Sequence, residues 1–126
     1  MITLEVTAPV HPTESEAKVE KALKNVFPSL EFYLSGGHFT GMSTDVESLT
    51  HFKELLEVQR IRDTANTILK RSFTRDGLIF YLNKQAAFMG KVNFSEECPL
   101  DPITVSVKGK NLHTLINRLS PRTVEQ

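Results

Sequence analysis

The chain has 126 residues, of which 40% are hydrophobic and 24% charged, so it fits one globular domain with a self-supporting core. Fifteen basic residues balance fifteen acidic ones, so the chain has no strongly positive net charge that would attract nucleic acid. Because no apolar run approaches the roughly 20 residues that cross a bilayer, we expect no membrane partner.

The first two predicted elements are a strand and a helix. Residues 2–6 alternate apolar and polar side chains, which is the period of a half-buried strand. Thr13 and Glu16 fit a capping box, in which the Thr13 hydroxyl accepts a hydrogen bond from the Glu16 amide and the Glu16 carboxylate accepts one from the Thr13 amide. We therefore expect the helix to begin there. Apolar residues follow at helical spacing until Pro28 ends the helix.

A strand pair and a long helical section come next. Residues 30–34 alternate again, Gly36 and Gly37 supply a tight turn, and residues 38–43 are predicted to return as a strand. In residues 45–71 the apolar stripe slips by about one residue partway along. A continuous helix needs an unbroken period, so we expect a kink or two helices that meet between residues 57 and 60.

The last third of the chain predicts three strands and a final helix. Residues 78–82 form an apolar strand, a polar corner follows, and residues 86–94 are predicted to return as a second strand with a bulge at Gly90. Residues 103–107 alternate as the last strand, and residues 112–119 form a short helix.

This order predicts the fold class. Strand, helix, two strands, a kinked or double helix, three strands and a helix indicate a single α+β domain over residues 1–126. Short turns between neighbouring strands favour a mainly antiparallel sheet of about six strands, with the helices on one face.

Residues with reactive chemistry are sparse. No Walker-type phosphate loop or nucleophile elbow is present, so we expect neither an enzyme nor a bound cofactor. The histidines are scattered and lack the helical spacing of a metal site; they are His11, His38, His51 and His113. Cys98 is the only cysteine, which excludes an internal disulfide and predicts a reducing, cytoplasmic compartment.

The positive charge is concentrated in one part of the sequence. Residues 53–91 hold eight bases against four acids, whereas residues 1–52 hold three bases against seven acids. Six of these bases are candidate contacts to RNA phosphates, namely Arg60, Arg62, Lys70, Arg71, Lys84 and Lys91. The alternative is that they are solvated or ion-paired, as Arg60 would be with Glu57 or Asp63 on the same helix.

Aromatic residues near these cations allow a second type of RNA contact. Phe80, Tyr81, Phe88 and Phe94 are suited to stacking on bases, as aromatic residues do on the sheets of several RNA-binding domains. Their spacing beside leucine and valine favours the other interpretation, in which they belong to the hydrophobic core.

Four segments of the sequence form a recognisable set, namely residues 6–14 (VTAPVHPTE), 60–65 (RIRDTA), 80–94 (FYLNKQAAFMGKVNF) and 99–103 (PLDPI). Together they resemble the archaeal uncharacterised protein family 0201. The resemblance implies a fold like that of the ribosomal protein of the L-five type, which binds RNA, and pairing into homodimers. It implies no catalytic residues.

Two functions therefore remain open. One is a binding module that contacts RNA phosphates through the basic middle third. The other is a homodimeric structural or protein-interaction module without nucleic-acid binding. For a dimer we expect an exposed sheet edge at the interface, either residues 38–43 or residues 103–107, because neither segment contains a lysine that would blunt an edge.

Overall fold

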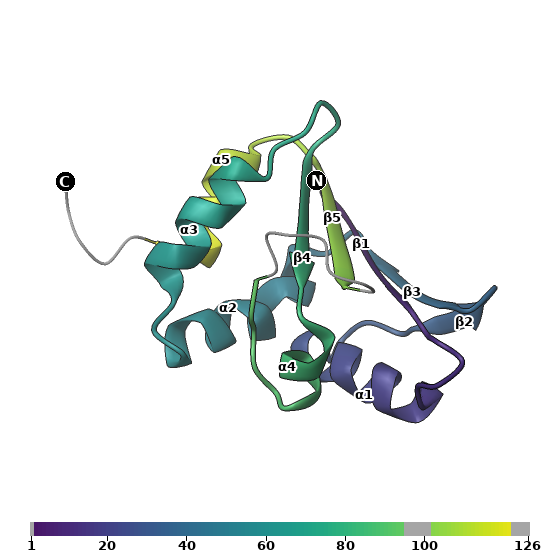
Figure 1. The fold of residues 1–126 in the computed structure, drawn as a ribbon. Helices are drawn as coiled ribbons and strands as arrows, with labels where there is room; N and C mark the ends of the chain where they lie inside the picture. The colour runs from purple at the N-terminus through teal and green to yellow at the C-terminus, as the bar shows by residue number, and fades with distance from the viewer. Residues whose placement is uncertain (1, 95–101, 122–126) are drawn as a thin grey trace.

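The computed structural model describes residues 2–94 and 102–121 of the chain. It confirms the α+β fold with an antiparallel sheet, but the sheet has five strands and not about six, in the order β2-β3-β1-β5-β4 (Figure 1). The elements are β1 (Ile2–Pro9), α1 (Glu16–Val26), β2 (Tyr33–Ser35), β3 (His38–Ser43), the 3₁₀ helix η1 (Val46–Leu49), α2 (Thr50–Val58), α3 (Arg62–Arg71), β4 (Leu78–Leu82), α4 (Lys84–Phe88), β5 (Ile103–Gly109) and α5 (Leu112–Leu119).

The helices lie on one side of the sheet, as Figure 1 shows. Alternate strand residues therefore face two different environments. In β1, Leu4 and Val6 are fully buried beneath the helices, whereas Glu5 and Thr7 lie on the opposite face and are only partly covered. The alternation that predicted this strand thus reflects one helix-covered face and one open face.

The core is centred on Phe52 of α2, which is fully buried. Its ring lies 5.8 Å from that of Phe27, 5.7 Å from that of Phe80 and 6.2 Å from that of Phe94, measured between centroids. These contacts join α1, α2 and β4 to the segment after α4. In the described part of the chain, every helix is too short or too polar to span a membrane.

The predicted break in the long helical section is confirmed. Helix α2 ends at Val58 and α3 begins at Arg62. Between them Arg60 adopts a left-handed backbone conformation with φ of 58°, which a continuous helix does not allow. The phase slip in the apolar stripe was the signal for this turn.

The predicted return strand at residues 86–94 is wrong. The chain forms the short helix α4 there, because the Asn83 side chain accepts a hydrogen bond from the Ala86 amide at 2.9 Å and caps the first turn. Gly90, with φ of 78°, ends this turn instead of forming a bulge. Asn25 of α1 donates to the carbonyls of Ala87 and Phe88, both at 3.0 Å, and ties α1 to α4.

The first helix does not begin with the predicted capping box. Its N-cap is Ser15, whose hydroxyl accepts from the Lys18 amide at 3.4 Å. The two predicted box residues, Thr13 and Glu16, have no such role, because Glu14 occupies this turn and accepts from the His11 amide at 2.9 Å.

The predicted sheet edges are also wrong. Strand β5 lies between β1 and β4, and β3 lies between β2 and β1, so both are interior strands. The edges are β2 and β4. Strand β4 is partly covered, because Phe73 and Phe94 form bridges with Leu78 and Leu82.

Candidate nucleic-acid interface

The six predicted phosphate contacts do not form one surface. Lys84 begins α4, Arg60 and Arg62 lie at the junction of α2 and α3, and Lys91 follows α4. Lys70 and Arg71 form the last turn of α3. These positions give a single engaged lysine, a group of three cations and a pair at the end of one helix.

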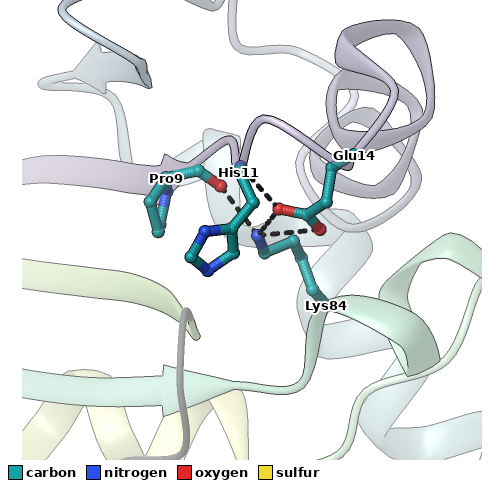
Figure 2. Close-up of polar contacts among 4 residues, drawn as sticks. All are labelled: Pro9, His11, Glu14 and Lys84. Carbon is teal, nitrogen blue, oxygen red and sulfur yellow. Dashed lines mark hydrogen bonds and ion pairs between the residues drawn. The ribbon is translucent and has the colours of Figure 1, made fainter.

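Lys84 is engaged inside the protein. Its Nζ donates to both Glu14 carboxylate oxygens, at 2.9 Å and 3.2 Å, and to the Pro9 carbonyl at 2.7 Å (Figure 2). Only 10% of the Lys84 side chain is exposed. Since β1 supplies Pro9, the contact joins the end of β1 to the start of α4, which are far apart in the sequence.

The Glu14 carboxylate is stabilised in its charged form. Burial by itself raises the pKa of Glu14, but the hydrogen bond from the His11 amide and the hydrogen bond and positive charge of Lys84 outweigh it. The pKa of Glu14 therefore lies below its ordinary value of 4.5. At neutral pH the pair is fully charged, so the charge of Lys84 is already compensated.

Arg60, Arg62 and Lys91 make up a second group, the corner cations. The Gln59 side chain donates to the Val92 carbonyl at 2.9 Å and accepts from the Val92 amide at 2.7 Å. Gln59 and Val92 are the sequence neighbours of Arg60 and Lys91, so this double hydrogen bond brings the two cations onto adjacent segments. Within the described residues, none of the corner cations forms an ion pair.

Lys70 and Arg71, at the end of α3, differ in their interactions. Lys70 is exposed and forms no ion pair within residues 2–94 and 102–121. Arg71 is exposed too but has an interaction partner. The predicted pairing of Arg60 with acids on its own helix is absent from the described structure, because Arg60 lies in the turn between two helices.

The core interpretation of the aromatic residues holds for most of them. Phe80 is only 2% exposed, and its ring lies 5.9 Å from that of Phe94, which packs on the core. Phe88 is partly buried beneath Lys21, whose Nζ lies 5.3 Å from the ring centroid. Tyr81 differs, because it alternates with the buried Phe80 and Leu82 and so lies on the open face of the sheet.

The open face carries a row of side chains that the sequence did not reveal. Strand pairing aligns Tyr33 with Thr40, Thr40 with Thr7, Thr7 with Thr104, and Thr104 with Tyr81. We call this set the tyrosine–threonine row. It crosses all five strands, with a tyrosine on each edge strand and three threonines between. The strand order needed to see it is not encoded in any local pattern.

Cations gather at one end of this face. Gly77 lies against β5, where a Cβ on Gly77 would clash with the Val107 carbonyl oxygen and meet the Lys108 Cα at 3.2 Å. This close approach brings the turn that holds Arg75 and Asp76 beside Lys108. We call Arg75 and Lys108 the end cations; both are exposed and form no ion pair among the described residues. Lys110, which follows β5, lines a hollow with Asp45 and Arg118 and does not belong to this set.

A cleft of about 590 Å³ lies between α1 and α4, lined in part by Lys18, Lys84, Phe88 and Met89. Lys84 is already paired there, so among the described lining residues Lys18 is the cation without an ion pair. No group of histidine, aspartate or glutamate side chains among the described residues is arranged to hold a metal ion. Cys98 lies outside the described residues.

Comparison with known proteins identifies the family. A family model described as RNA binding matches residues 3–109. The UPF0201 protein of Thermococcus onnurineus is 40% identical over 124 residues, which cover 95% of this chain and 92% of that protein. The chain belongs to the UPF0201 family.

Solved structures agree with this assignment. The crystal structure of an uncharacterised UPF0201 protein is 35% identical to this UPF0201 chain and superposes with a TM-score of 0.87, covering 98% of this chain and 97% of that one. The UPF0201 protein of Methanococcus jannaschii is 32% identical, with a TM-score of 0.83 and coverage of 97% and 95%. The expected likeness to the L-five ribosomal protein stays a prediction.

Proposed function

We propose that this UPF0201 protein is a non-enzymatic module that binds RNA and contacts its phosphates through the corner cations. The observation that carries the proposal is that the Gln59–Val92 hydrogen bonds place Lys91 next to the segment that contains Arg60 and Arg62, and that none of the three forms an ion pair within the described structure. The description of the matching family model supports it. A neutral protein would therefore offer RNA three cations on two neighbouring segments, none of them ion-paired among the described residues.

Such contacts position RNA and do not read its sequence. Arginine suits this role, because its planar guanidinium donates two parallel hydrogen bonds to a phosphate. Lys70 lies on the same helix as Arg62 and extends the set. Lys84 would have to leave Glu14 to reach a phosphate, so in this proposal it acts by holding α4 in place.

The test is a fluorescence-anisotropy titration with a labelled, structured RNA at several salt concentrations. We expect binding that weakens as salt rises, because bound phosphates release counterions. The triple variant Arg60→Gln/Arg62→Gln/Lys91→Gln should lower the slope of log affinity against log salt by about three, one for each lost phosphate contact. Lys18→Gln, an exposed lysine on α1, is the matched control. Wild-type protein that fails to bind at low salt, or binds without a salt slope, contradicts the proposal.

A second candidate function, homodimerisation, is favoured by the β2 edge. Leu34 of β2 pairs with the buried Phe39 and is 40% exposed at the outer edge of the sheet, while Tyr33, 67% exposed, and Met42, 60% exposed, lie on the open face of β2 and β3. Strand β2 contains neither lysine nor proline and no described strand covers its outer side. We propose that two copies pair along β2 around a two-fold axis and bury about 1,200–2,000 Å² in total.

Light scattering tests the dimer. We expect a mass of twice the 14.2 kDa chain at micromolar concentration, and a shift toward one chain for Leu34→Lys, which puts a charge on the edge. Val58→Lys is the control, because Val58 is 78% exposed on α2 and distant from β2 in the fold. A mass of one chain for the wild type across a tenfold dilution rules the dimer out.

A further inference from the structure

The two tyrosines of this chain occupy the same face. The sequence contains only Tyr33 and Tyr81 and no tryptophan. Both belong to the tyrosine–threonine row, one on each edge strand of the sheet. Tyr33 is 67% exposed, and Tyr81 is partly exposed although both of its neighbours in β4 are buried. The buried aromatic residues described above are phenylalanines, so the rings that carry a hydroxyl are on the open face.

We propose that the open face binds single-stranded RNA, with bases stacked on Tyr33 and Tyr81 and the strand crossing the threonines between them. This rests on the proposed function and adds to it the class of RNA and the surface that contacts its bases. The corner cations supply phosphate contacts that any RNA can make. The tyrosine rings supply contacts that only an unpaired base can make, because a base inside a duplex presents no free face.

The dimensions of the row fit a short single strand. Neighbouring strands lie about 4.8 Å apart, so four strand spacings separate the tyrosines by roughly 19 Å. Successive stacked nucleotides advance by about 3.4 Å and extended ones by more, so the row spans roughly five nucleotides or fewer. The hydroxyls of Thr7, Thr40 and Thr104 lie along this path, and each is both a donor and an acceptor of hydrogen bonds.

Two cations at one end of the face suit a phosphate backbone. The end cations, Arg75 and Lys108, lie at the end of the sheet where β5 finishes, and Lys108 is two rows of this face away from Thr104. Two acids lie near the row: Glu5 is partly buried next to Ser106, and Glu31 accepts a hydrogen bond from the Tyr33 hydroxyl at 2.9 Å. A backbone that leaves the row on the side of β5 and β4 therefore meets two cations without an ion pair among the described residues.

A second copy of the chain fits the face less well. The core of a protein–protein interface is apolar and depleted in charge. Here the centre of the face consists of threonine, serine and the carboxylate of Glu5, while the apolar side chains Ile79 and Met42 lie apart on opposite sides of it. The dimer proposed above joins the backbones of two β2 edges, and because the side chains of a strand point to the faces of a sheet, Tyr33 would stay on the open face of the joined sheet.

The experiment compares single-stranded and duplex RNA on four variants of the full chain. The probes are a labelled oligouridine of about ten nucleotides, within the usual site sizes for such proteins, and a blunt hairpin duplex of the same label. Tyr33→Ala and Tyr81→Ala should each weaken oligouridine binding by roughly five- to 150-fold, the range for loss of one base stack. Tyr33→Phe and Tyr81→Phe keep the ring and should bind within about twofold of the wild type. Hairpin binding should stay unchanged in all four.

A measurement on the wild type makes the test independent of variant folding. If the tyrosine rings are selectively labelled for NMR, all ring signals come from two residues, Tyr33 and Tyr81. Binding of oligouridine should shift the signals of both. If the wild type binds oligouridine but neither signal shifts and both alanine variants bind normally, the face is not the site, while the proposed function stands. If it binds neither probe, both proposals fail. If the signal of Tyr81, on the edge strand remote from β2, shifts with protein concentration in the absence of RNA, a second copy covers the face and the inference is overturned.

Discussion

Lys84 and Arg60 come from the same basic third of the sequence, but the fold gives them opposite surroundings. The Lys84 side chain is 10% exposed, pairs with the Glu14 carboxylate and donates a hydrogen bond to the Pro9 carbonyl, so its charge stabilises the fold. Arg60 lies in an exposed turn and forms no ion pair within the described residues. The number of charged residues in a segment therefore does not give the net charge of the surface that the segment forms. Even a neutral chain has uncompensated cations on its surface where its acidic residues lie elsewhere in the fold.

The largest expected effect is the loss of the Lys84 contacts. Lys84→Met removes the ion pair and the hydrogen bond to Pro9 and leaves the partly buried Glu14 carboxylate without its cation. We expect the free energy of unfolding to fall by about 2 kcal/mol. Urea unfolding at neutral pH measures it. Lys91→Met, which removes an exposed lysine that has no ion pair among the described residues, should change stability by no more than about 0.5 kcal/mol. Equal losses in the two variants would mean that the Lys84 contacts add nothing to the stability of the fold.

The next prediction concerns Gln59, which brings the corner cations together. Gln59→Leu removes both hydrogen bonds to the Val92 backbone, so we expect a loss of about 1.5 kcal/mol in the free energy of unfolding. Affinity for RNA should fall too, although every cation is retained. Gln85→Leu is the control, because Gln85 is exposed and its side chain makes no hydrogen bond with the described residues. Unchanged RNA affinity in Gln59→Leu would show that the corner cations act independently.

The third prediction is a pH dependence of the Glu14–Lys84 pair. Because the pKa of Glu14 is lowered in the folded protein, ionised Glu14 stabilises the fold above the ordinary carboxyl pKa, and this stabilisation is lost as pH falls through the lowered value. Glu14→Gln should therefore cost about 1 kcal/mol at neutral pH, and its cost should shrink on acidification. Unfolding of both proteins at a series of pH values measures the difference. Glu57→Gln, at an exposed site without an ion pair among the described residues, should show no such trend.

The same comparison shows how far the sequence predicts the fold. Strong periodicity predicts β1, α3 and α5, the Gly36-Gly37 turn predicts β3, and the phase slip predicts the turn at Arg60. The apolar run of residues 86–94 fits a strand or a helix equally well, and the Asn83 cap on the Ala86 amide decides for the helix. Alanines at two successive positions and a glycine two residues after the helix were the signals that favour a short helix over a strand.

The candidate site was less predictable than the fold, because it depends on which strands are neighbours. The sequence identified the corner cations and Tyr81 as residues but not their surroundings. Nothing local to Tyr33 or Tyr81 indicates that three threonines connect them, since that row exists only in the strand order β2-β3-β1-β5-β4. The prediction that β3 and β5 are edge strands is wrong for the same reason, because only the strand order shows that both are interior.

The smallest expected change in stability is at Arg60, and it separates binding from folding. Arg60 adopts a left-handed conformation that costs a residue with a Cβ about 1–2 kcal/mol, whereas glycine adopts it freely. Arg60→Gly should therefore raise the free energy of unfolding by roughly 0.5–1 kcal/mol, after the greater flexibility of glycine in the unfolded chain is subtracted. Arg60→Ala retains the backbone strain and should not stabilise.

Both variants lose the guanidinium, so in the anisotropy titration both should weaken RNA binding equally, by about two- to fivefold for one phosphate contact near physiological salt. A loss of affinity in Arg60→Gly alone would mean that the rigid turn, and not the charge, contributes to binding. Stabilisation of Arg60→Gly, together with weaker RNA binding by both variants, would show that the protein retains a strained arginine in this turn because of its charge.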